Sequence, residues 1–188
     1  TCKVYARKCA IVSVPNELAR EFYELNHIQG WRRTGTHLGL QHSGQLVAVM
    51  TFTQNLSERD TNAGTTWELA RFASTAQVVG GASKLFEALL DATKAAAVVS
   101  YSDDRLFTGR MYESIGFNLH SKVSPSYTYW RSGRKIRLHK SHFRHSKLAT
   151  LLGSSYNPTM TERENCEAAG YYQVYDCGLT KWVWQSTT

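Results

Sequence analysis

Residues that interrupt, cross-link or anchor a chain are scarce in this sequence. It has 3 Pro and 4 Cys among 188 residues, and it contains no apolar run of the roughly 18 residues that a membrane-spanning helix needs. The cysteines form no close pairs of the zinc-ribbon type and are too few to cross-link a chain of this length; they are Cys2, Cys9, Cys166 and Cys177. We therefore expect reduced thiols, a cytoplasmic location and no membrane partner.

Acidic residues are missing from residues 131–147, which we call the basic segment. The formal net charge of the whole chain is +7. Outside the segment, Lys and Arg equal Asp and Glu in number, so the segment carries the entire positive excess. Such local charge indicates phosphate contacts and makes DNA the expected partner, whereas a solvated basic linker is the alternative. Its cations are Arg131, Arg134, Lys135, Arg137, Lys140, Arg144 and Lys147.

Three histidines of the basic segment, His139, His142 and His145, recur at every third position. This spacing would bring them near one face of a helix. No carboxylate or thiol accompanies them, and protein zinc sites commonly include such ligands. We therefore expect no metal site.

Hydrophobic patterning over residues 4–130 predicts strands that alternate with helices. Leu18, Phe22 and Leu25 share one face of a predicted helix for which Asn16 is the N-cap. The expected order is strand 4–14, helix from 16, loop 26–36, hairpin 36–41 and 45–53, polar loop 57–64, strand 65–74, a glycine turn 77–82 that opens a helix, strand 97–103, helix 108–115, and strands 117–122 and 126–130.

The remaining residues predict a basic C-terminal extension that packs on this core. Thr161 and Glu164 form the pattern of a capping box, and Gly170 ends the helix that they begin. Residues 171–184 then indicate a hairpin around Asp176-Cys177-Gly178. We therefore divide the chain into a core, 1–130, and an extension, 131–188.

A possible anion site lies between the strand 65–74 and the helix that follows it. Gly80 and Gly81 allow a phosphate to approach the backbone, and the helix N-terminus offers unpaired N–H groups; a plain turn is the alternative. Alternation along the strand would place one set of side chains on one face and a second set on the other. These sets are Glu68, Ala70 and Phe72, and Trp67, Leu69 and Arg71.

Two segments resemble the signature motifs of the GNAT acyltransferases. Residues 77–82, QVVGGA, are similar to Gln/Arg-x-x-Gly-x-Gly/Ala, and residues 111–117, MYESIGF, are similar to the second motif, which ends in Gly-Phe. Three departures stand beside them: Leu106 replaces an Asn, Gly109 replaces an Ala, and no Pro precedes the glycine loop. The resemblance covers residues 4–130 and implies a GNAT fold, with a central mixed, mostly antiparallel sheet flanked by helices.

The resemblance also implies a cofactor and a set of site residues. Acetyl-CoA or another acyl-CoA would bind at Phe72, Ser74, Gln77, Val78, Val79, Gly80, Gly81, Ala82 and Ser83. Glu68 stands where a base is often placed, and Tyr112 where the general acid is placed; an ion pair and a packed aromatic ring are the structural alternatives. Ser102 and Asp103, at the end of the strand beside the thioester, are further catalytic candidates.

A looser resemblance concerns the acceptor. Segments such as NHIQG (26–30), SYSD (100–103) and YDCG (175–178) are similar to phage-encoded GNAT-like proteins, including Mom-type enzymes that modify adenine in DNA. It implies acyl transfer to the N6 amine of adenine, in the host cytoplasm, with aromatic side chains stacked on a flipped base. The alternatives are a DNA-binding module without catalysis and an N-acetyltransferase of small amines or proteins. Substrate contacts are expected from His27, Gln29, Arg71, Arg134, Lys135, Arg137 and Lys140, and stacking from Trp31, Tyr127, Tyr129 and Trp130.

Overall fold

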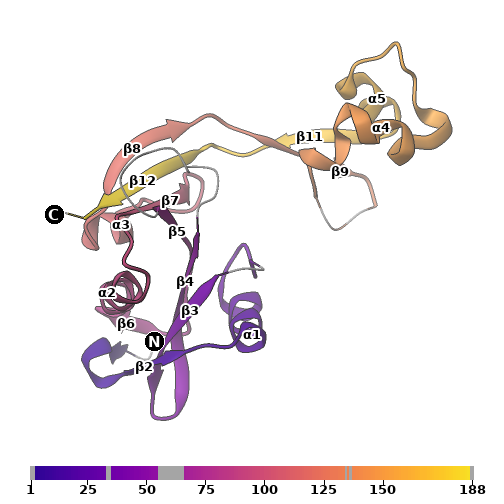
Figure 1. The fold of residues 1–188 in the computed structure, drawn as a ribbon. Helices are drawn as coiled ribbons and strands as arrows, with labels where there is room; N and C mark the ends of the chain where they lie inside the picture. Colours follow the sequence, from indigo (N-terminus) through magenta and orange to yellow (C-terminus); the bar gives the residue numbers. More distant parts are fainter. Residues whose placement is uncertain (1–2, 33–34, 55–65, 134, 136, 187–188) are drawn as a thin grey trace. The chain divides into compact units, whose positions relative to one another are not determined.

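The computed structural model describes residues 3–32, 35–54, 66–133, 135 and 137–186, which form two compact units (Figure 1). Unit 1 consists of residues 1–102, 106–122 and 180–188, and unit 2 consists of residues 103–105 and 123–179. The chain leaves unit 1 after Lys122 and returns at Thr180, so unit 2 is an insertion. The expected division after residue 130 differs from this arrangement because the last strand returns to the first unit.

Unit 1 is built on a seven-stranded sheet. Strands β2 to β5 pair in antiparallel fashion, whereas β5 and β7 are parallel. This mixed and mostly antiparallel sheet confirms the predicted fold class, and the hairpin around His42-Ser43-Gly44 is also confirmed. In spatial order the strands are β2 (Ala10–Ser13), β3 (Thr36–His42), β4 (Gln45–Gln54), β5 (Thr66–Ser74), β7 (Ala97–Asp103), β12 (Leu179–Gln185) and β8 (Asn118–Val123).

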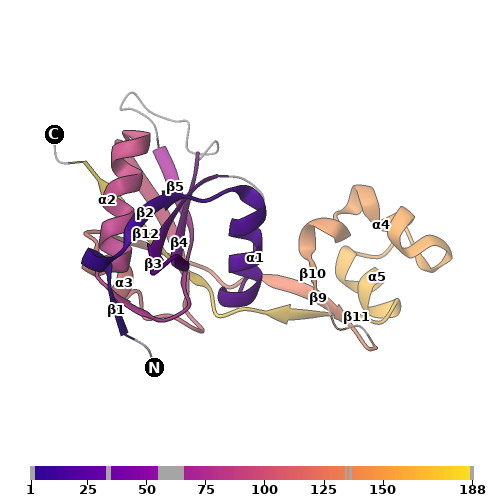
Figure 2. The same cartoon turned by 90° about the horizontal axis from the view of Figure 1, so that it is seen from below.

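Helices cover both faces of this sheet, with α1 (Asn16–Asn26) on one side and α2 (Gly81–Thr93) and α3 (Arg110–Ser114) on the other (Figures 1 and 2). Leu85, Phe86 and Leu89 of α2 are buried at helical spacing in the larger core. Burying side chains at i, i+3 and i+4 removes one continuous stripe of a helix from water. The two apolar cores therefore lie on opposite faces of one sheet.

The buried face of α1 differs from the predicted one. Ala19, Phe22 and Tyr23 pack against the sheet, whereas Leu25 is 84% exposed. Pro15 occupies the N-cap position in place of Asn16, whose Oδ1 lies 2.9 Å from His37 Nε2. Asn16 therefore binds the neighbouring strand instead of capping its own helix.

The first predicted strand, 4–14, divides into three elements: β1 (Lys3–Tyr5), a 3-10 helix η1 (Ala6–Lys8) and β2. β1 pairs in parallel with β6 (Gln77–Val79), so part of the predicted glycine turn is a short strand. Lys84 Nζ donates to the carbonyls of Ala6, at 3.0 Å, and Cys9, at 2.7 Å. These bonds hold the N-terminal segment against the start of α2.

An irregularity in β5 changes which side chains share a face. Thr51 pairs with Arg71 and Phe52 with Leu69, which leaves Ala70 as an extra residue in β5. Such a bulge interrupts strict alternation. Leu69 and Phe72 consequently both pack into the core beneath α2, so the predicted separation of Phe72 from Leu69 is wrong.

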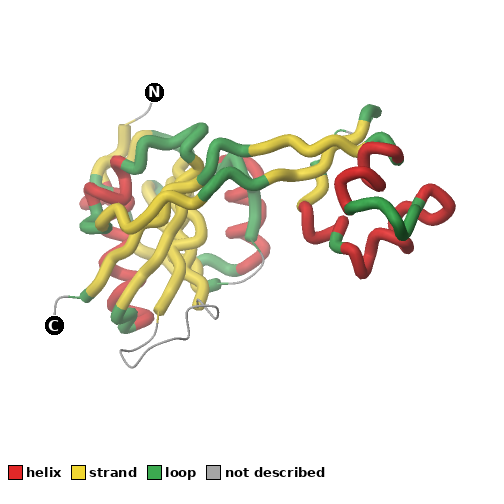
Figure 3. Tube along the Cα trace, turned by 90° about the horizontal axis from the view of Figure 1, so that it is seen from above, coloured by secondary structure: helices red, strands yellow, loops and turns green. Residues whose placement is uncertain are grey.

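Unit 2 has a three-stranded antiparallel sheet in the order β10 (Leu138–His139), β9 (Tyr127–Arg131) and β11 (Tyr171–Tyr175). The predicted pair 117–122 and 126–130 and the predicted hairpin 171–184 are wrong, because each contributes one strand to each unit. The capping box of Thr161 and Glu164 is confirmed at the start of α5. The other elements are helical (Figure 3): η2 (Lys140–Phe143), α4 (His145–Leu152), η3 (Gly153–Ser155) and α5 (Glu162–Ala168). The core of unit 2 comprises Tyr129, Phe143, Leu148, Cys166 and Tyr171.

Within the ranges that the structure describes, no helix is both long enough and apolar enough to cross a bilayer. The predicted loop 57–64 and Cys2 lie outside those ranges.

The position of Gly109 gives a test of the packing between α3 and β12. A Cβ at Gly109 would lie 2.0 Å from Trp182 Cζ2, and the residue has φ +81°. We predict that Gly109→Ala lowers the free energy of unfolding by about 2–4 kcal/mol, through overpacking together with left-handed strain.

Gly44→Ala is the matched control, because Gly44 has φ +80° and no atom lies within 4 Å of the position that its Cβ would take. This control should lose about 1 kcal/mol from strain alone. Equal losses in urea denaturation would show that Trp182 does not restrict Gly109.

Candidate active site

The candidate site lies where β5 and β7 part. Their parallel ladder runs from Thr66 and Ala97 to Glu68 and Val99. Beyond it, Ser100 Oγ lies 2.8 Å from the carbonyl oxygen of Leu69, so a side chain bridges the two strands. Both strands continue past the end of this ladder, β5 to Ser74 and β7 to Asp103.

The hydroxyl of Tyr112, from α3, lies next to Ser100, where β5 and β7 part. Its oxygen lies 2.9 Å from Ser100 Oγ and 3.5 Å from the carbonyl oxygen of Tyr101. The ring stacks on Trp182 of β12, with centroids 5.5 Å apart and planes 14° apart. Burial raises the pKa of Tyr112, against smaller lowering effects of Ser100 and Arg71. The phenol therefore keeps its proton at neutral pH.

Glu68 and Arg71 approach the same region from β5. Glu68 forms an ion pair with Arg32, and its side chain is 18% exposed. Arg71 donates through Nε to the Gly30 carbonyl, at 3.2 Å, and through Nη1 to the Ala70 carbonyl, at 2.7 Å. Burial lowers the pKa of Arg71, with Arg32 as the next cause. The charges of Arg71 and Glu68 both act on Tyr112, so these three predicted residues interact electrostatically.

The predicted substrate residues His27 and Gln29 lie in the loop after α1. The Gln29 N–H donates to His27 Nδ1 at 3.1 Å, which leaves Nε2 to carry the ring proton. Burial, assisted by the charge of Arg71, lowers the pKa of His27 to about 4. His27 is therefore neutral at physiological pH, whereas Gln29 is exposed.

A buried polar chain on this side of the sheet was not predicted. The Tyr23 hydroxyl lies 2.8 Å from Thr51 Oγ1, and Thr51 Oγ1 lies 2.7 Å from His37 Nδ1. Tyr23 also donates to the carbonyl of Arg71 at 3.3 Å. Residues from α1, β3, β4 and β5 meet here, so no local motif in the sequence could reveal the chain. It fixes the backbone of β5 beside Arg71.

The two other predicted catalytic residues, Ser102 and Asp103, are hydrogen-bonded to neighbouring side chains. Ser102 is buried, and its Oγ accepts the indole N–H of Trp182 at 2.9 Å. Asp103 belongs to unit 2, where Arg105 Nη2 donates to its Oδ2 at 2.8 Å and its Oδ1 accepts the Arg105 backbone N–H. The side-chain bond from Arg105 is the largest cause of the lowered pKa of Asp103. Their catalytic roles stay predictions.

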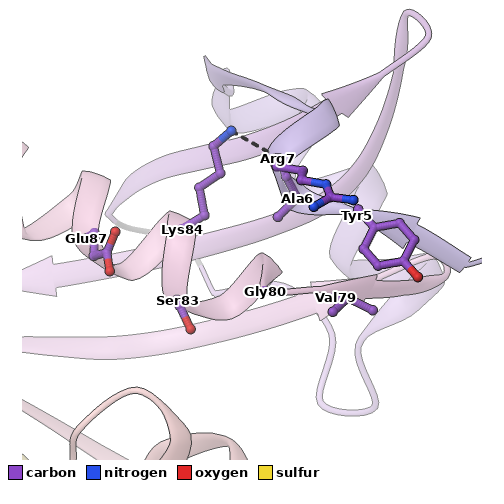
Figure 4. A pocket seen from close by; sticks show the side chains of 8 residues that line it. All are labelled: Tyr5, Ala6, Arg7, Val79, Gly80, Ser83, Lys84 and Glu87. Atoms are coloured by element: carbon purple, nitrogen blue, oxygen red, sulfur yellow. Dashed lines mark hydrogen bonds between the residues drawn. The ribbon is translucent and has the colours of Figure 1, made fainter.

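The predicted cofactor loop leads directly into α2, which begins at Gly81 after Gly80 with φ +73°. The pocket beside it, of about 510 Å³, includes three of the predicted residues, Val79, Gly80 and Ser83 (Figure 4). Phe72, Val78 and Ala82 instead pack against the larger core, and a Cβ on Gly81 would lie 2.9 Å from Val78. Gln77 is exposed, and Ser74 pairs with Ala48. The pocket's other lining residues are Tyr5, Ala6, Arg7, Lys84 and Glu87.

The cations predicted to contact nucleic acid, Lys135, Arg137 and Lys140, belong to unit 2, and Arg134 lies outside the described residues. Lys135 and Arg137 are exposed between β9 and β10, and Lys140 Nζ lies 5.4 Å from the ring centroid of Tyr127. Tyr129 is fully buried in the unit 2 core, so its predicted stacking on a base is wrong. Among the residues described, no three His, Cys, Asp or Glu side chains gather as metal ligands.

The low pKa of His27 predicts a pH dependence of stability. The unfolded chain takes up this proton near pH 6.5, whereas the folded chain takes it up near pH 4. Between these values the unfolded state binds more protons, so stability falls as the pH falls. We predict that His27→Asn loses less stability than the wild type between pH 7 and pH 4.5. Parallel urea midpoints for the two proteins would contradict this assignment.

Comparisons with known proteins agree on the architecture. No protein-family model and no curated protein matches the sequence. A CoA complex of an acetyltransferase from Bacillus subtilis matches with a TM-score of 0.53 and 13% identity, over 95% of this chain and 99% of that one. The ribosomal-protein-S18-alanine N-acetyltransferase from Escherichia coli matches with a TM-score of 0.52 and 15% identity, over 96% and 95%. A GNAT family acetyltransferase from Elizabethkingia anophelis with bound acetyl-CoA matches with a TM-score of 0.52 and 12% identity, over 95% and 99%. The chain therefore has the GNAT acetyltransferase fold.

Proposed function

We propose that the protein transfers an acyl group from an acyl-CoA thioester to an amine. The observation that carries this proposal is the placement of the Tyr112 hydroxyl against Ser100, where β5 and β7 part. Glu68 and Arg71 lie close enough for their charges to act on the same phenol. A proton donor, a carboxylate and a guanidinium are therefore near enough to one another to interact electrostatically.

The chemistry requires two proton movements. A C–N bond forms as the amine attacks the thioester carbonyl and the C–S bond breaks, so the amine must lose a proton and the thiolate must gain one. Tyr112 suits the second task because its raised pKa keeps it protonated. Glu68 is the candidate for the first task, and its carboxylate forms an ion pair with Arg32 that would have to open for an amine to approach.

The start of α2 has the features needed to hold the pyrophosphate of an acyl-CoA. The first N–H groups of a helix have no intrahelical acceptor, and the helix dipole favours negative charge there. At Gly80 the nearest atom to a Cβ would be that of Ala6, 3.8 Å away, so this side of the backbone is open. Bound acyl-CoA would supply the activated acyl group, and the chain would supply its orientation and the protons. The matched Bacillus subtilis and Elizabethkingia anophelis structures contain CoA and acetyl-CoA, which supports this cofactor.

For the acceptor, we propose the N6 amine of adenine in DNA. The support is the exposed cations of the basic segment, among them Lys135, Arg137, Arg144 and Lys147. Adenine N6 is a weak nucleophile, so its attack would require the orientation and proton removal described above. An amine of a protein or a small molecule is the alternative acceptor. Nucleoside mass spectrometry of DNA from cells that express the protein distinguishes these acceptors.

The glycine loop predicts acyl-CoA binding that a charge can disrupt. Gly80→Asp should weaken acetyl-CoA binding at least about tenfold, because a carboxylate would oppose the phosphates and the side chain would enter the open space. Gly44→Asp, at similar φ in open space, is the control and should bind normally. Calorimetry that detects no binding by the wild type at millimolar acetyl-CoA would refute the proposal.

The proton-transfer roles predict losses of turnover without loss of binding. Tyr112→Phe and Glu68→Gln should each lower kcat by about 10²–10⁴, while acetyl-CoA binding stays within a few-fold of the wild type. Phe at 112 keeps the ring that stacks on Trp182, so the fold should persist. Tyr101→Phe, an exposed tyrosine in β7, is the control. A variant with wild-type turnover would remove its residue from the mechanism.

A further inference from the structure

The sheet of unit 2 has two faces of different character. Tyr129 and Tyr171 lie on one face and are buried against Phe143, Leu148 and Cys166. Side chains alternate along a strand, so the residues next to these two tyrosines lie on the opposite face. Among the described residues of the unit 2 core, none lies on that opposite face of β9 or β11.

Two large aromatic side chains stand next to each other on this second face. Trp130 of β9 pairs directly with Tyr172 of β11, and Trp130 is 37% exposed while Tyr172 is 53% exposed. Directly paired residues in an antiparallel sheet place their Cβ atoms about 5 Å apart. Thr128 and Val174 form the next pair along the strands and are half-buried. We call Trp130, Tyr172, Thr128 and Val174 the aromatic face.

Uncompensated cations lie at the end of β9 that carries this aromatic pair. Lys135 and Arg137 are exposed in the connection from β9 to β10, and neither forms an ion pair within the described part of the chain.

The carboxylates of residues 123–179 are occupied elsewhere. Glu162 accepts from Tyr129, Glu164 caps α5, Glu167 pairs with Arg163, and Asp176 accepts from the backbone of Ser126 and Gly178. Acidic side chains of this segment are therefore already bonded to other groups, and an external polyanion would complement Lys135 and Arg137.

We propose that the aromatic face binds unpaired bases of a single-stranded nucleic acid. The rings of Trp130 and Tyr172 stack on bases, and Lys135 and Arg137 contact the flanking phosphates. Stacking on aromatic side chains needs a base whose face is exposed, which a single strand offers and an intact duplex does not. This inference does not depend on acyl transfer, because none of these residues belongs to the candidate active site.

Fluorescence anisotropy with a labelled single-stranded oligonucleotide of mixed sequence, at low salt and without acyl-CoA, tests the proposal. Trp130→Ala and Tyr172→Ala should each weaken binding roughly tenfold to a hundredfold, as expected for loss of one stacked base. Tyr172→Phe should bind like the wild type, because it keeps the ring. The double change of Lys135 and Arg137 to Ala should reduce the slope of log affinity against log salt by about 1.4.

Tyr175→Ala provides the matched control. Tyr175 is on the same strand, is 58% exposed, and lies on the opposite face, so its removal should leave binding unchanged. Circular dichroism confirms that each variant is folded. Three results would overturn the proposal. The wild type does not bind the single strand, the Trp130→Ala and Tyr172→Ala variants bind it as tightly as the wild type does, or the wild type binds a duplex as tightly as a single strand. Acetyl-CoA calorimetry on the same proteins reports separately on the proposed catalytic function.

Discussion

The extra residue at Ala70 determines how the candidate site is assembled. Strict alternation would place Glu68 and Arg71 on opposite faces of β5, because they are three residues apart. The bulge brings both to one side, while Leu69 and Phe72 both enter the core beneath α2. Glu68 and Arg71 can thus share one side of the strand, where their charges act on Tyr112, while the apolar positions of the core stay filled. Bulges often re-aim side chains next to active sites in this way.

The arginine that the bulge positions also organises the surrounding backbone. Arg71 bonds the carbonyl of Gly30, and its own carbonyl accepts from Tyr23. Tyr23 is in turn held by Thr51, which is bonded to His37. A buried polar group is stable only when it is hydrogen-bonded, so this chain restricts α1, β3, β4 and β5 to one arrangement. It couples the loop that carries His27 to the strand that carries Glu68.

Much of unit 1 could be predicted because its signals are local. A continuous apolar run indicated β4, a short turn with Gly44 indicated the hairpin, and the helical spacing of Leu85, Phe86 and Leu89 indicated α2. The failures depend on contacts between distant residues. The hydrophobicity of residues 179–185 indicates a strand but not its neighbours, and in the structure that strand lies between β7 and β8. The buried face of α1 was also predicted wrongly. Leu18 and Leu25 are the more hydrophobic residues and were expected to be buried, but the sheet packs against the smaller Ala19.

The point of insertion explains how one chain can combine the two units. β8 and β12 are neighbours in the sheet. Where the chain returns, a Cβ added at Gly178 would lie 2.6 Å from the carbonyl oxygen of Val123, so the two segments run close together. The pairing of β8 with β12 thus holds the two ends of residues 123–179 together. The entropic cost of closing a connection rises only slowly with its length, so an insertion of this size is tolerated. Unit 2 contributes its own core around Tyr129 and Phe143. Because unit 2 has its own core, substitutions on its binding surface can change what it binds without disturbing the candidate active site between β5 and β7. Function resides in such sites, which the fold only supports.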